Sequence, residues 1–216
     1  MRFRDREHAA HLLAQKLLEY RGKHPLVLAI PRGAVPMGKI IAETLEGELD
    51  VVLVHKLGAP DQPELAIGAV DEFGHLYLAD YVHELGVSEA YIAAEKAAQL
   101  ETLRKRCALY TPIRPPIDPA GRICIVVDNG IATGASMIAA LRAVRAQQPT
   151  KLIAAAAVAP PHTLERIAAE ADETVCVEIP DFFYAVGQFF EDFSQVSDAD
   201  VVAILRHSQP TSARET

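Results

Sequence analysis

The sequence predicts an α/β protein with a twisted parallel sheet, helices on both faces, a β-hairpin and a small C-terminal addition. Apolar runs of strand length recur along the chain, and most lack the polar alternation of a sheet with one wet face. Segments with helical spacing lie between them, which is typical of parallel strands joined by right-handed crossovers. The predicted strands are residues 26–30, 49–56, 123–127, 151–158 and 174–177.

Length and composition favour one domain over residues 1–207, because 216 residues that are 50% hydrophobic can bury a substantial core. The polar tail 208–216 is expected to be disordered. A net charge of −8 argues against a nucleic-acid partner. No apolar run is long enough for a membrane span, the N-terminus lacks a signal peptide, and the three widely spaced cysteines fit a reducing compartment. We expect a cytoplasmic protein.

The first part of the chain predicts a covering helix followed by a strand-loop-helix unit. Residues 5–20 place apolar side chains at helical spacing, and the strand 26–30 follows them. A second helix is expected with Pro36 in its first turn. In the loop between, Arg32 can bind phosphate oxygens through two hydrogen bonds, and Gly33 permits a close approach of the backbone to a ligand. This loop is a candidate diphosphate site.

The next strand, 49–56, is expected to deliver Lys56 to the same edge of the sheet. A loop rich in Gly and Pro follows at 57–64. Residues 66–70 and 76–78 then read as the two strands of a β-hairpin.

The second half alternates helices and strands. Ser88 is a candidate cap for a long, charged helix that runs to about Tyr110, and several prolines end it. Further helices are expected after residue 136, from Pro160 to about residue 171, and over 197–205.

A polar loop follows the apolar strand 123–127, and it is the strongest functional signal in the chain. It supplies the carboxylate of Asp128, the amide of Asn129, and then a run of small or hydroxylated residues up to Ser136. A helix pattern begins at once, so the loop lies at a helix N-terminus, where backbone N–H groups bind anions. The GxxxxGK[ST] and GxGxxG phosphate motifs are both absent. An acid followed by a phosphate cradle indicates a sugar phosphate.

The segment 178–195 is unusually aromatic and contains six Phe and Tyr residues, with Pro180 and Gly187 interrupting any regular period. One interpretation is a hydrophobic plug over the sheet edge or a subunit contact. The other is a surface that stacks on a planar ligand.

These features together resemble the type I phosphoribosyltransferases, in particular a subgroup of stand-alone bacterial members, over about residues 1–206. The resemblance rests on ICIVVDNGIATGAS ending at Ser136, PRGAVP from Pro31, KLGAPDQPELAIGAV from Lys56 and FFYAVGQFFEDF from Phe182. It implies a fold of that family, with the segment 178–195 as a hood over the acceptor. One position departs from the family pattern, because Asn129 stands where the family has a second acid.

The resemblance also implies roles for individual residues. Asp128 and Asn129 would hold the ribose hydroxyls of phosphoribosyl diphosphate (PRPP) as the catalytic pair, and Arg32, Gly33 and Lys56 would bind its diphosphate. The residues implied for the 5-phosphate are Ile131, Ala132, Thr133, Gly134, Ala135 and Ser136. The hood residues implied for the acceptor are Phe182, Phe183 and Tyr184. Loop 57–64 would be a lid over PRPP, with an ordinary hairpin connection as the alternative.

The expected activity is transfer of the phosphoribosyl group from PRPP to a nitrogen acceptor such as a nucleobase, with release of diphosphate. Mg²⁺ would be held mainly by substrate oxygens, with Asp128 as the one possible protein ligand. The chain is expected to form a homodimer. The alternative is a regulatory protein that binds PRPP or a nucleotide without turnover, which the neutral Asn129 would permit. A metal-dependent hydrolase is remote, because no His or carboxylate cluster accompanies Asp128.

Overall fold

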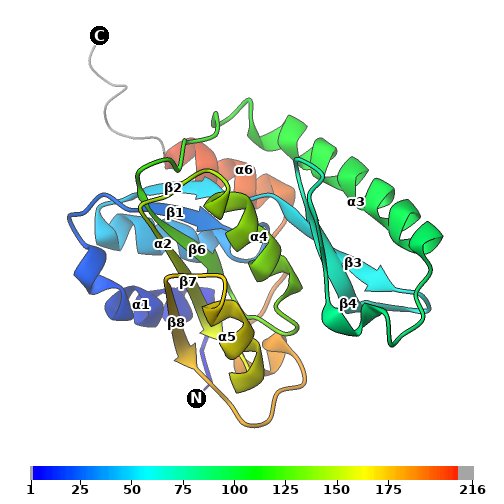
Figure 1. Cartoon of the computed structure of the whole chain (residues 1–216). Coiled ribbons are helices and arrows are strands. Elements are labelled where there is room, and N and C mark those ends of the chain that lie inside the picture. Colours follow the sequence, from blue (N-terminus) through cyan, green and yellow to red (C-terminus); the bar gives the residue numbers. More distant parts are fainter. Residues whose placement is uncertain (1, 209–216) are drawn as a thin grey trace.

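The computed structural model describes residues 2–208 and confirms the predicted α/β class (Figure 1). Five strands form one parallel sheet in the order β2-β1-β6-β7-β8. They are β1 (Leu26–Ala29), β2 (Glu48–Val51), β6 (Ile123–Asp128), β7 (Lys151–Val158) and β8 (Glu173–Glu178). Ala29 pairs with Val127, so the loops that follow β1 and β6 start side by side. The tail expected to be disordered lies outside the described residues, apart from Ser208.

Helices cover both faces of the sheet, as predicted (Figure 1). They are α1 (Arg6–Lys16), α2 (Val35–Leu45), α3 (Glu89–Tyr110), α4 (Ala135–Arg145), α5 (Pro161–Ala168) and α6 (Asp198–His207). In β6, Cys124 and Val126 pack with α4, whereas Ile125 and Val127 pack in the core that contains α1 and α2. Both faces are therefore apolar, which explains why this strand shows no polar alternation.

Side-chain caps fix several helix starts. Asp5 accepts a hydrogen bond from the backbone N–H of His8 at 2.7 Å, and Ser88 and Ser197 cap α3 and α6 in the same way. The first helix is shorter than predicted, because α1 ends at Lys16 and only a 3₁₀ turn follows. Among the described residues, no helix is both long enough and apolar enough to cross a bilayer.

The predicted strand 49–56 is wrong, because the structure divides it between two sheets. After β2 ends at Val51, the chain turns away and β3 (Val54–Ala59) joins β4 (Gln62–Asp71) and β5 (Leu76–Leu78) in an antiparallel sheet. The cause is long-range pairing, since Val54 finds its partner in Asp71. The β4–β5 hairpin itself is confirmed, with α3 and α4 packed against this second sheet.

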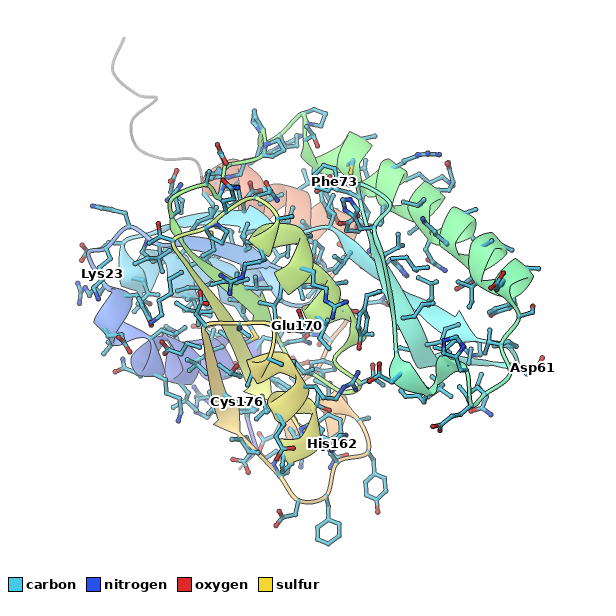
Figure 2. All side chains as sticks on the ribbon, in the orientation of Figure 1. Lys23, Asp61, Phe73, His162, Glu170 and Cys176 are labelled. Carbon is cyan, nitrogen blue, oxygen red and sulfur yellow. The ribbon has the colours of Figure 1, made fainter. Side chains whose placement is uncertain are left out.

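The expected loop 57–64 is also mostly strand. Ala59 pairs with Gln62, so only Pro60 and Asp61 connect β3 to β4. Asp61 has a φ of 61°, a left-handed conformation that Asp tolerates better than most residues. It lies at the tip of the hairpin, far from the parallel sheet (Figure 2). The segment has the form of an ordinary hairpin connection, and its role as a lid stays a prediction.

The aromatic segment after β8 splits into buried and exposed parts. Phe189 and Phe190 are buried, and Phe190 forms a β-bridge with Phe3, which ties the N-terminus to the hood. In contrast, Phe182 is 79% exposed and Tyr184 is 89% exposed. The segment therefore acts partly as the hydrophobic plug, and it also presents aromatic rings on the surface.

Candidate active site

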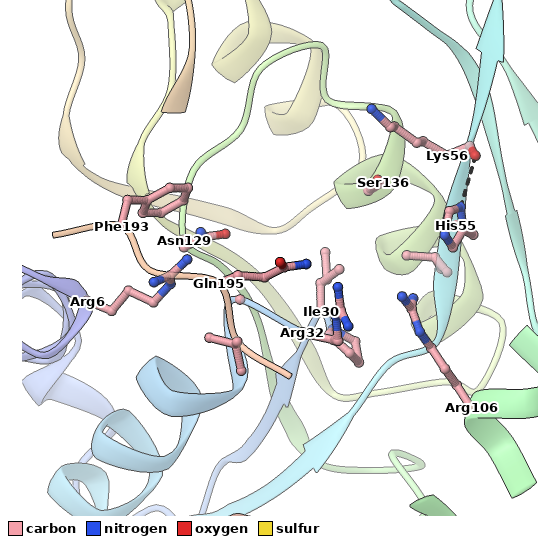
Figure 3. Close-up of a pocket in the computed structure, with 14 residues that line it drawn as sticks. Arg6, Ile30, Arg32, His55, Lys56, Arg106, Asn129, Ser136, Phe193 and Gln195 are labelled. Atoms are coloured by element: carbon pink, nitrogen blue, oxygen red, sulfur yellow. Dashed lines mark hydrogen bonds between the residues drawn. The ribbon is translucent and has the colours of Figure 1, made fainter. Parts of the chain in front are cut away.

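A cavity of about 460 Å³ opens beside the carboxyl ends of β1 and β6 (Figure 3). It is lined by the start of α1, the loop after β1, strand β3, helix α3, the loop after β6 and the segment before α6. Its polar lining side chains are Arg6, Arg32, His55, Lys56, Arg106, Asn129, Ser136 and Gln195. Four of these are Lys or Arg and none is Asp or Glu, although the protein as a whole has a net negative charge. The cavity is therefore suited to binding anions.

The loops after β1 and β6 touch at this cavity. The peptide bond between Pro31 and Arg32 is cis. At the next position, a Cβ added to Gly33 would lie 3.0 Å from Nδ2 of Asn129, so any larger residue would crowd the amide in its present position. The loop after β1 therefore packs closely against the amide of Asn129.

A carboxylate behind the cavity positions two of its arginines. Asp198, the first residue of α6, lies 3.4 Å from Nη1 of Arg32 and 3.9 Å from Nε of Arg106. Tyr110 donates a hydrogen bond to the same carboxylate, and burial together with that carboxylate raises the pKa of the Tyr110 hydroxyl. The phenol therefore stays protonated as a donor. The single carboxylate of Asp198 thus offsets only part of the charge of the two guanidinium groups, and the net charge that faces the cavity is positive.

A second cavity of about 460 Å³ adjoins the first and shares Lys56 and Ser136 with it. Asp128 and the loop residues 130–136 line the second cavity, whereas Asn129 lines the first. Successive residues at the end of a strand point to opposite sides, so the acid and the amide face different compartments. Lys56 lies between the two.

Helix α5 holds the loop from outside. Thr163 donates a hydrogen bond to the carbonyl of Ala132 at 2.8 Å, and Arg166 donates one to the carbonyl of Thr133 at 3.1 Å. Gly134 has a φ of 84° and precedes the first residue of α4. The carbonyls of Ala132 and Thr133 thus accept hydrogen bonds from α5. The N–H groups in the first turn of α4 have no partner within the helix, and they lie at the second cavity.

Asp128 has an unusual proton affinity. Removal from water raises its pKa to about 7, and hydrogen bonds from the backbone N–H groups of Gly130 and Asn129 act in the opposite direction without cancelling the effect. A carboxyl group that titrates near neutral pH inside a cavity is typical of a functional site. Its carboxylate form would be favoured by a ligand that brings hydroxyl donors or positive charge.

Comparisons with known proteins agree with this geometry. Residues 5–194 match the family model described as a phosphoribosyl transferase domain. The chain belongs to the phosphoribosyl transferase family. Proteins named "Putative phosphoribosyl transferase" in two strains of Mycobacterium tuberculosis are 42% identical to it over 204 residues. That alignment covers 94% of this chain and 46% of each relative, so the chain spans about half the length of these relatives.

Solved structures agree on the fold. The crystal structure of TT1426 from Thermus thermophilus is 45% identical, with a TM-score of 0.82, and the match covers 97% of this chain and 100% of that one. A protein of Aquifex aeolicus, AQ2163, shares the fold at 15% identity with a TM-score of 0.52, and the match covers 84% of this chain and 76% of that one. The predicted family and its fold are therefore confirmed.

The structure brings most of the predicted phosphoribosyl transferase residues together. Arg32, Gly33, Lys56 and Asn129 line the first cavity, and the predicted phosphate-loop residues line the second. Lys56 arrives by a different route than predicted, because it lies on β3 of the antiparallel sheet and not on a strand of the parallel one. The assigned roles of these residues stay predictions.

The three residues predicted to bind the acceptor lie in different places in the structure. Tyr184 lines the second cavity, whereas Phe182 lines neither cavity and Phe183 packs against Phe189 with ring centroids 5.4 Å apart. Phe193 of the same segment lines the first cavity instead. The aromatic cluster is evident in the sequence, but no regular period runs through it that would indicate which rings face inward.

Several cavity residues were missed entirely, namely Arg6, His55, Arg106 and Gln195. Arg6 and Arg106 lie on helices whose charged residues read as solvated surface, and only the packing of α1 and α3 around the sheet edge brings them inward. No local signal in the sequence distinguishes them from neighbouring charged residues.

The described residues at this site fit a metal ion that is held largely by a bound ligand. Among the described side chains, no group of three His, Cys, Asp or Glu residues is arranged to bind a metal. Asp128 is the one carboxylate among the residues that line the two cavities. Mg²⁺ often binds through one or two carboxylates with water and substrate phosphates, so this single carboxylate fits a Mg²⁺ ion carried largely by substrate.

Proposed function

We propose that this chain transfers the phosphoribosyl group of PRPP to a nitrogen acceptor, a nucleobase or a similar heterocycle, and releases diphosphate. The observation that carries the proposal is the pair of adjoining cavities that share Lys56 and Ser136. One has the arginines suited to a diphosphate, and the other has a carboxylate and a helix N-terminus suited to a ribose phosphate. Lys56 stands where the two groups of PRPP would join.

The loop from residue 131 to Ser136 would bind the 5-phosphate through backbone N–H groups. This contact is remote from the reacting carbon, so its binding energy serves to place C1 of the ribose between the two cavities. The hydrogen bonds from Thr163 and Arg166 support the role, because they hold the loop carbonyls away from the phosphate.

In the reaction, the bond from ribose C1 to the diphosphate oxygen breaks and a bond from the acceptor nitrogen to C1 forms, and the proton of an acceptor N–H group is released to solvent. The bonding electrons leave with the diphosphate, and the ring gains positive charge of the kind seen in glycosyl transfer. Arg32 and Lys56 would stabilise the departing charge, with Gly33 allowing close approach. Asp128, as a carboxylate, would accept a hydrogen bond from a ribose hydroxyl and would stabilise the positive ring.

Mg²⁺ bound to substrate oxygens would neutralise part of the diphosphate charge, with Asp128 as its possible protein ligand.

A second candidate is a PRPP-binding or nucleotide-binding regulatory protein without turnover, and the observation that favours it is Asn129. Its amide can still accept a hydroxyl hydrogen bond, but it carries no charge to stabilise the ring in the transition state. Release of diphosphate from PRPP in the presence of a nucleobase panel separates the two candidates. Turnover supports the transferase, and binding without turnover supports the regulator.

We also propose a homodimer, because the exposed rings of Phe182 and Tyr184 are an unusual apolar feature of the hood surface. Sedimentation equilibrium tests it. A monomer at micromolar concentration would contradict this part of the proposal.

Isothermal titration with PRPP and Mg²⁺ tests the substrate assignment. Saturable binding with one site per chain is expected, and absence of binding at millimolar PRPP would refute it.

A further inference from the structure

The cavity beside β1 has two ends with different chemistry. Arg32, Lys56 and Arg106 make one end cationic, as a diphosphate requires. Figure 3 shows Arg6 at the other end with the side chain of Gln195 between it and Arg32. The cavity therefore extends from Arg32 toward Asn129, whose sequence neighbours Asp128 and Gly130 line the second cavity, so this end also borders the proposed ribose position.

The far end combines an aromatic wall, two amides and a guanidinium. Phe193 supplies the wall, Asn129 and Gln195 supply hydrogen-bonding groups, and Arg6 supplies the positive charge. Phosphate sites do not need an aromatic face or side-chain amides, whereas a planar heterocycle with polar edges fits both. This end is suited to the acceptor.

Arg6 is held in place for binding and is not neutralised. Its guanidinium carbon lies 4.1 Å from the centre of the Phe193 ring, and its Nη1 donates a hydrogen bond to the carbonyl of Ser194 at 2.7 Å. Both partners are neutral, and Nε has no hydrogen-bond partner among the described residues. Asp192 attracts it only through longer-range electrostatics, since its carboxylate is bonded to the backbone and hydroxyl groups of Ser194.

This differs from the other end of the cavity, where Asp198 offsets the charge of Arg32 and Arg106. A half-buried arginine whose stacking and hydrogen-bonding partners are neutral is suited to bind an anion, and a carboxylate matches its planar geometry best.

We propose that the acceptor is a planar nitrogen heterocycle that carries a carboxylate, and that Arg6 is the residue that selects for this group. The inference rests on the proposed transferase function, but it concerns the acceptor alone. The acceptor would then be an anion, and the chain would discriminate against neutral nucleobases.

The test uses pairs of compounds that differ only in the charge of one substituent. Uracil-6-carboxylate is compared with uracil, and pyridine-3-carboxylate with pyridine-3-carboxamide, by calorimetric titration of the full chain at pH 8, with and without saturating PRPP and Mg²⁺. In at least one pair the carboxylate is expected to bind about tenfold more tightly or better, as charge-assisted hydrogen bonds typically give. Equal binding within both pairs, or binding of neither member, would overturn the proposal.

The variants assign the preference to one side chain. Arg6→Gln should reduce the carboxylate preference to near unity, and Arg6→Lys should keep part of it. Arg4→Gln is the matched control, because it makes the same change in charge at an exposed position two residues away and outside the cavity lining. A thermal unfolding curve for each variant verifies folding, and the paired titrations of the wild type remain decisive if Arg6→Gln does not fold.

Free diphosphate is titrated separately against the same variants. If Arg6→Gln weakens diphosphate binding and leaves the carboxylate preference intact, Arg6 belongs to the diphosphate site and the proposal is wrong. Failure of PRPP to bind, with the carboxylate preference still present, would refute the transferase function while leaving the anion-selective end of the cavity supported. The two ideas can therefore fail independently.

Discussion

Replacing Asp128 by asparagine should change how the stability of the protein depends on pH. The folded pKa of Asp128 is about 7, whereas an unfolded aspartate titrates at about 3.9. Between these values the folded state binds a proton that the unfolded state has lost, so the free energy of unfolding falls as pH rises. The slope is about 1.4 kcal/mol per pH unit for one proton.

From pH 4 to pH 7 the free energy of unfolding of the wild type should therefore fall by up to about 4 kcal/mol. Solvent access to the half-buried carboxylate makes the decrease smaller. Asparagine removes the titration, so Asp128→Asn should gain stability relative to the wild type as pH rises. Urea unfolding of both proteins at pH 5, 6 and 7 measures the difference, and the other titrating groups cancel because they are common to both. A constant difference across this range would refute the reasoning.

The same group links pH to ligand binding. A bound ribose hydroxyl or metal ion favours the carboxylate, so PRPP with Mg²⁺ should bind with release of a proton below pH 7 and with little release above pH 8. Titrations in buffers of different ionisation enthalpy measure the proton count, and Asp128→Asn should abolish it.

Three further substitutions test separate parts of the site. Asn129→Asp should raise turnover more than PRPP affinity, because only the transition state gains positive charge at the ring, and equal effects on both would argue against that role. Arg166→Ala removes the hydrogen bond to the carbonyl of Thr133 and should weaken PRPP binding about tenfold, as titration would show; unchanged affinity would contradict support of the loop. Gly130→Ala would place a Cβ 2.4 Å from Cγ1 of Val186 and should cost about 1–3 kcal/mol of unfolding free energy, which an unchanged urea midpoint would exclude.

The parallel sheet could be predicted from the sequence because its central strands β1, β6 and β7 are buried on both faces. Such strands read as continuous apolar runs, and β6 and β7 have nearly the predicted limits. The division of residues 49–56 could not be predicted, because Val54 is paired with Asp71 on a strand that lies downstream. Local periodicity contains no information about which partner a strand will find.

The same limit applies to the site. The loop after β6 and the Arg32–Gly33 turn were predictable because each is continuous in sequence and follows a recognisable strand. Arg6 and Phe193 reach the same cavity from opposite ends of the chain, through the packing of α1 against the hood. Their inward positions follow from tertiary structure alone.

Calorimetric titration of the full chain with PRPP and Mg²⁺ shows whether the two adjoining cavities form a PRPP site. Saturable binding to one site per chain is expected, and Arg32→Ala should weaken it about tenfold or more, since a charge-assisted contact to the diphosphate is lost. Arg4→Ala, which removes a positive charge from an exposed position, should retain the wild-type affinity. No detectable binding at millimolar PRPP, or equal affinity of the wild type and Arg32→Ala, would contradict the account.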